Sequence, residues 1–106
     1  MDQVSWGYDF ACGKSIDTIL AAFNSAGAWQ WRVGDSDIYG DYLKCRPKGH
    51  ADIRVYDARQ FWTWRAGDRE GFWAELSCNR NDRAEIDQSF LDLLRRIDAR
   101  NISESS

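Results

Sequence analysis

The side chains with the clearest chemical potential are three cysteines, Cys12, Cys45 and Cys78, and one histidine, His50. A cysteine thiolate can act as a nucleophile with histidine as its base, and thiolate and imidazole are common zinc ligands. Cys45 and His50 stand in a C-x4-H spacing, but the chain has no C-x-x-C pair to complete a zinc site. We therefore predict no metal and no cofactor, and we expect Cys45 and Cys78 to be buried structural thiols.

Cys12 differs from the other cysteines because it precedes an expected helix start, where the partial positive charge of the helix end lowers a thiol pKa. An alternative function therefore stays open: a small-molecule-binding or thiol-dependent protein centred on Cys12 and His50. Gly13-Lys14-Ser15 also looks like the end of a phosphate-binding loop, but Tyr8 stands where the first glycine of that loop belongs. We interpret Ser15 as a helix N-cap and Lys14 as a solvated side chain.

Charge and length restrict the classes of partner. The chain has 106 residues and a formal net charge of -3, which disfavours a general nucleic-acid binder because such affinity grows with the number of neutralised phosphates. No apolar run is long enough to span a membrane, and the first residues lack the pattern of a signal peptide. We expect a cytoplasmic protein with reduced thiols and a single domain over residues 1–100.

Hydrophobic spacing predicts the elements that must position these side chains. Apolar residues at every second position indicate strands over residues 4–10, 28–33, 41–46, 51–57, 61–66 and 72–78. Helical spacing indicates one helix over 15–26 and a second one near the C-terminus, where Asp82 and Glu85 have the spacing of a capping box. Residues 101–106 contain one apolar side chain and are expected to form a disordered tail.

This order of elements predicts an α+β fold. The simplest arrangement is a two-layer sandwich: a single, mostly antiparallel sheet of five to six strands with the N-terminal and C-terminal helices packed on one face. The expected helix-covered face contains Trp29, Trp31, Ile53, Val55, Trp62, Trp64, Phe72 and Leu76. This layout is shared by many bacterial accessory proteins, and such a fold does not by itself define a function.

The opposite face combines aromatic and cationic side chains, which are enriched at protein interfaces. We predict that this face is the contact surface of a non-enzymatic binding protein that engages a protein partner or a second copy of itself. Two alternatives are an ordinary solvated face with cation–π contacts and an acidic hairpin loop over residues 34–41 as the contact. The candidate binding residues are Arg32, Tyr42, Lys44, Arg46, Arg54, Tyr56, Phe61, Arg65 and Trp73.

Overall fold

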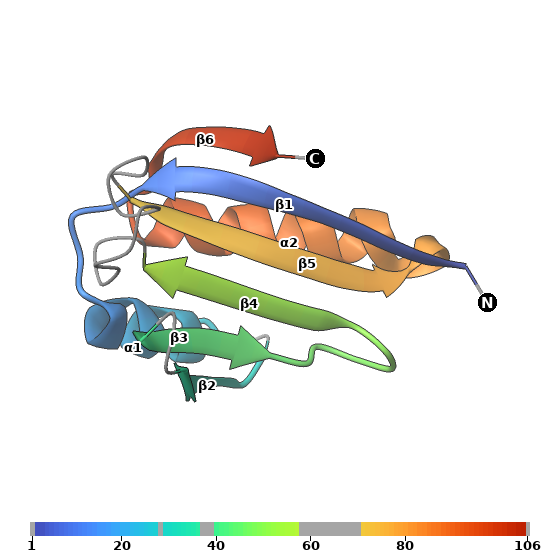
Figure 1. Cartoon of the computed structure of the whole chain (residues 1–106), viewed down its shortest axis with the longest axis horizontal. Helices are drawn as coiled ribbons and strands as arrows, with labels where there is room; N and C mark the ends of the chain where they lie inside the picture. Colours follow the sequence, from blue (N-terminus) through green and yellow to red (C-terminus); the bar gives the residue numbers. More distant parts are fainter. Residues whose placement is uncertain (1, 28, 37–39, 58–70, 106) are drawn as a thin grey trace.

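The computed structural model describes residues 2–27, 29–36, 40–57 and 71–105, and within them six strands and two α-helices (Figure 1). The helices are α1 (Ile16–Ser25) and α2 (Arg83–Arg96), and a short 3-10 turn, η3 (Arg80–Asp82), leads into α2. The strands are β1 (Gln3–Ala11), β2 (Trp31–Ser36), β3 (Gly40–Cys45), β4 (Asp52–Asp57), β5 (Phe72–Asn79) and β6 (Arg100–Ser105).

All six strands belong to one sheet, in the order β2-β3-β4-β5-β1-β6, and every neighbouring pair is antiparallel. The antiparallel pairing of β2 with β3 and of β3 with β4 confirms the prediction from the short connections. Strand β4 pairs directly with β5, so the place between them that the sequence predicted for another strand is taken by this pairing. The expected strand over 61–66, with Trp62 and Trp64, lies outside the described residues. No helix of the described ranges is long and apolar enough to cross a bilayer.

Both ends of the expected acidic loop belong to strands instead. Residues 34–36 continue β2, and Gly40 and Asp41 begin β3, so Asp35 stands directly opposite Asp41 in the ladder. A hairpin ladder can extend past its apolar residues because main-chain hydrogen bonds hold it together. The loop that the sequence predicted as a candidate contact surface is therefore shorter than residues 34–41.

The C-terminus also differs from its expectation. The sequence predicts a disordered tail, whereas Arg100–Ser105 form β6 at the edge of the sheet and pair with β1. Asp98 and Asn101 have positive φ angles of 57° and 55°, which turn the chain back after α2. Strand pairing of this kind uses main-chain groups, so a low apolar content does not prevent it.

One face of the sheet is covered by both helices. The cross-strand register places Trp31, Cys45, Ile53, Leu76 and Trp6 on the same face, in one row that crosses five strands. The Trp31 ring lies 4.8 Å from the ring of Phe23 on α1 and 6.5 Å from the ring of Phe90 on α2, measured between centroids. The α+β fold class and its antiparallel sheet are therefore as predicted.

The two helix starts follow different rules. Ser15 accepts a hydrogen bond from the Thr18 backbone N–H at 3.2 Å, which confirms the predicted N-cap of α1. Asp82 makes no capping hydrogen bond at the start of α2. Lys48 instead forms ion pairs with both Asp82, at 3.4 Å, and Glu85. The predicted capping box is wrong because a lysine from another part of the chain takes its two carboxylates.

Candidate functional site

Cys12 and His50 lie at opposite ends of strand β1. The main-chain oxygen of His50 accepts a hydrogen bond from the Gln3 side chain at 3.2 Å, and Gln3 is the first residue of β1. Cys12 follows the last residue of the same strand, so nine residue steps of about 3.3 Å place it roughly 30 Å from Gln3. Figure 1 shows the β3–β4 connection at the far end of the sheet from the end of β1. The fold therefore does not bring a Cys12–His50 pair together.

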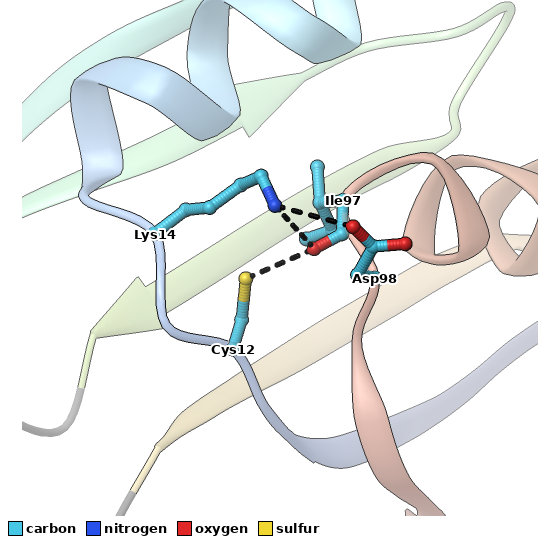
Figure 2. Close-up of polar contacts among 4 residues, drawn as sticks. All are labelled: Cys12, Lys14, Ile97 and Asp98. Atoms are coloured by element: carbon cyan, nitrogen blue, oxygen red, sulfur yellow. Dashed lines mark hydrogen bonds and ion pairs between the residues drawn. The ribbon is translucent and has the colours of Figure 1, made fainter.

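The Cys12 thiol instead stabilises the end of a helix (Figure 2). Cys12 Sγ donates to the Ile97 carbonyl oxygen at 3.3 Å, and Lys14 Nζ donates to the same oxygen at 3.3 Å. Lys14 also pairs with Asp98 at 3.5 Å, so it is not the freely solvated lysine that the sequence suggested. These bonds satisfy a carbonyl just after α2, where positive charge is favourable. Cys12 is only 7% exposed.

The other two thiols are buried, as predicted. Burial, followed by the charge of Asp52, raises the pKa of Cys45 to about 12. Burial and the charge of Asp82 also raise the pKa of Cys78. A raised pKa keeps both groups as unreactive thiols. The residues that the structure describes contain no group of three His, Cys, Asp or Glu side chains that could hold a metal ion.

The face away from the helices contains a row of stacked aromatic rings. Tyr42, Tyr56 and Trp73 stand directly opposite one another on β3, β4 and β5. Their ring centroids are 5.1 Å apart for Tyr42–Tyr56 and 4.9 Å apart for Tyr56–Trp73. Tyr56 and Trp73 are each only 5% exposed, although the sequence places them on an exposed contact surface. The predicted exposure of Tyr56 and Trp73 is therefore wrong.

A glycine on the next strand continues this row. Gly34 of β2 stands opposite Tyr42, and a Cβ atom on Gly34 would lie 2.5 Å from the Tyr42 ring. Glycine is therefore required for the ring to lie over the β2 backbone, an arrangement that shields a glycine within a strand. Gly34 is not among the residues predicted from the sequence. The signal that marks it is a glycine inside an otherwise alternating strand, next to a strand with aromatic residues.

Beside the aromatic row lies a second row, which is cationic and exposed. Arg32, Lys44 and Arg54 stand directly opposite one another on β2, β3 and β4. Together with Arg46 they border a hollow of about 550 Å³. The structure thus brings together four of the predicted cations. The hollow is lined by Trp29, Gln30, Arg32, Tyr42, Lys44, Cys45, Arg46, Pro47, Asp52 and Arg54.

Arg54 is held in place by its neighbours. Its Nε atom lies 3.1 Å from Asp52 Oδ2, and its guanidinium carbon lies 6.0 Å from the centre of the Tyr42 ring. A hydrogen bond with the Tyr56 side chain raises the pKa of Arg54, with a further contribution from the charge of Asp52. Asp52 also faces Arg46, at 4.0 Å. The single acid of the hollow is thus shared between Arg46 and Arg54.

Among the described residues, Arg32 and Lys44 have no such compensating acid. They stand directly opposite each other, both exposed, and no carboxylate of the described ranges lies within ion-pair distance of either. Like charges in directly opposite positions of a sheet are destabilising. The chain contains 17 acidic residues, so the juxtaposition does not reflect a shortage of acids. Phe61 and Arg65, the other predicted binding residues, lie outside the described residues.

No known protein family matches the chain, and no curated protein is similar to it in sequence.

Proposed function

We propose that this is a non-enzymatic binding protein whose cationic hollow binds an acidic segment of a partner protein. The observation that carries the proposal is the uncompensated pair Arg32 and Lys44, directly opposite each other at the border of the hollow. An acidic side chain placed between them would relieve their mutual repulsion and form charge-assisted hydrogen bonds with both. Arg54, already oriented by Asp52 and Tyr42, would add a third, preorganised donor.

A protein partner explains the lining of the hollow better than the alternatives do. Small-molecule sites are mostly apolar with a few polar groups, whereas four cations and one acid border this hollow. Nucleic-acid-binding proteins usually have a net positive charge, whereas this chain has a net charge of -3. A short acidic segment needs only a local cluster of cations.

We place the binding event in the cytoplasm. Cys12, Cys45 and Cys78 are buried, reduced thiols, and reduced thiols are the normal state of cysteine in a reducing compartment.

The test compares two double variants that lose the same amount of charge. Arg32→Gln with Lys44→Gln removes the uncompensated pair, and Arg95→Gln with Arg96→Gln removes two exposed cations from α2. The probe is a fluorescent octapeptide that alternates glutamate with valine or threonine, and its control has glutamine in place of glutamate. Binding is measured by fluorescence anisotropy at increasing salt concentration.

We expect the first double variant to weaken binding of the acidic peptide by about tenfold or more, because two close charge pairs are lost. The α2 variant should bind like the wild type, and binding should weaken as salt rises. Equal binding of the glutamate and glutamine peptides would overturn the proposal. Equal losses in the two double variants would also overturn it, because they would reflect overall charge rather than this hollow.

A further inference from the structure

Strand β2 forms one edge of the sheet, and at Trp31 a side chain takes the place of a neighbouring strand. The Asn24 side chain accepts a hydrogen bond from the Trp31 N–H at 2.7 Å and donates one to the Trp31 carbonyl at 3.3 Å. These two bonds imitate those of an adjacent strand. They also show that the main-chain groups of Trp31 point away from β3, toward the free side of the edge.

The same geometry identifies the open part of this edge. Main-chain groups alternate in direction along a strand, so those of Val33 and Asp35 point outward like those of Trp31. No hydrogen-bond partner for these outward groups occurs among the described residues. Within the part of the chain that the structure describes, Asn24 closes the edge at Trp31, and the edge is open from Val33 onward.

The side chains along this edge differ between the two faces of the sheet. Val33 lies on the helix-covered side and is 42% exposed, which is unusual for a valine next to the core. Arg32 lies on the other side, at the border of the cationic hollow. A strand beside β2 would therefore meet an apolar side chain on one face and a cation on the other.

We propose, resting on the function proposed above, that the partner segment binds as an extended strand paired antiparallel with the outer edge of β2. Its residue opposite Val33 is apolar, and the residue beside Arg32 is acidic, within reach of Lys44 across the face. Antiparallel pairing is chosen because every pair of neighbouring strands in this sheet is antiparallel. In such recognition the main chain supplies affinity and alternate side chains supply specificity.

A second copy of this chain fits the edge less well. Two β2 strands related by a two-fold axis at Val33 would place Arg32 opposite Gly34 of the other copy, which gives the cation no acidic neighbour. Asn24 would also prevent the pairing from extending past Trp31. Charge complementarity therefore favours a different chain with alternating acidic and apolar residues.

Amide hydrogen exchange with the alternating octapeptide gives a direct test. The amides of Val33 and Asp35 point outward and should exchange rapidly in the free protein, whereas those of Arg32 and Gly34 face β3 and should already be protected. Saturation with the peptide should protect the Val33 and Asp35 amides by about tenfold or more. Unchanged exchange at both positions in the saturated complex would overturn strand addition.

Backbone methylation of the peptide supplies a matched control. In the antiparallel pairing, the valine and threonine amides of the peptide face β2 and the glutamate amides face away. N-methylation at valine and threonine should weaken binding by about tenfold or more, and N-methylation at glutamate should have a much smaller effect. The proposal is wrong if both methylated peptides bind equally well.

A substitution in the protein, rather than in the peptide, tests the same edge. Val33→Pro removes the outward N–H without removing a bond to β3, since proline is tolerated at strand edges. Val33→Ala keeps the N–H and serves as the control, and thermal melts verify that both variants fold. We expect Val33→Pro to bind the peptide more weakly than Val33→Ala, and equal affinities would contradict the proposal.

The two proposals fail in different ways. If glutamate matters and the Arg32 and Lys44 variant loses binding, but exchange at Val33 does not change, the cationic hollow is the site and strand addition is wrong. If the glutamine peptide binds as well as the glutamate peptide, the function proposed above is wrong. A concentration-dependent dimer that protects the Val33 amide without peptide would assign the edge to a second copy. That result would overturn the proposal that a different chain binds there.

Discussion

The two faces of this sheet bury aromatic rings to a similar degree, although both helices pack on only one of them. Trp31 on the helix-covered face and Trp73 on the opposite face are 3% and 5% exposed. Two residues before the buried Tyr56, however, Arg54 is exposed on the same face of the same strand. The open face is therefore divided into a buried aromatic row and an exposed cationic row, and each row needs its own test.

The largest expected effect lies on the helix-covered face. Phe90 of α2 is fully buried beside Trp31 and Tyr8, so Phe90→Ala should destabilise the protein by about 3 to 5 kcal/mol. Denaturant unfolding measures the change. A loss below about 1 kcal/mol would mean that α2 contributes little to this core.

Trp73 tests whether the aromatic row on the other face belongs to the folded core. Trp73→Ala removes a buried ring stacked on Tyr56 and should destabilise the protein by about 3 kcal/mol, close to the value for Phe90→Ala. The same unfolding experiment gives both numbers. A nearly unchanged stability would return Trp73 to the contact surface that the sequence predicted.

Gly34→Ala tests whether the Tyr42 ring lies over the β2 backbone on the open face. A methyl group at this position meets the Tyr42 ring, so Gly34→Ala should cost about 1 to 3 kcal/mol of stability. In a Tyr42→Ala background the same substitution should cost much less, because the ring that it meets is gone. A double-mutant cycle measures this coupling, and independent effects would show that the ring does not lie over Gly34.

Tyr8, on the helix-covered face, should make the stability of the folded protein depend on pH. Its hydroxyl group and the Trp6 indole N–H, at 2.8 Å, both donate to Asp87 Oδ1 on α2. Burial and then this carboxylate raise the pKa of Tyr8 above its usual 10, so above pH 10 the folded state binds more protons than the unfolded state. Stability should therefore fall as pH rises past 10, by at most about 1.4 kcal/mol per pH unit.

Tyr8→Phe should remove that part of the alkaline loss. Unfolding is measured for both proteins from pH 8 to pH 11.5, where the wild type should show the steeper decline. Parallel curves would assign the loss to other groups.

The smallest effect is expected in the labelling rates of the three cysteines, which report how accessible each buried thiol is to a reagent. Cys12 is 7% exposed and Cys78 is completely buried, and burial raises the pKa of Cys45 to about 12. Labelling with iodoacetamide at pH 8, followed by peptide mass spectrometry, should therefore modify Cys12 first. Faster labelling of Cys45 would mean that β3 opens more readily than the end of β1.

The sequence alone was informative about local structure. The period of two placed Trp31, Ile53 and Leu76 on one face, and the helical spacing in α2 placed Phe90 among them, as the register and the ring contacts confirm. The same parity placed Arg32, Lys44 and Arg54 together on the opposite face. These predictions succeed because side-chain direction in a strand or helix depends only on the neighbouring residues along the chain.

Only the tertiary structure decided which distant segments meet. It placed β1 between β5 and β6, separated Cys12 from His50, buried Tyr56 and Trp73, and closed part of the β2 edge with Asn24. None of these outcomes follows from periodicity, because strand pairing uses main-chain groups that every residue except proline carries in full. Parity reports the face of a sheet on which a side chain lies, and the packing of distant segments determines whether that side chain is exposed.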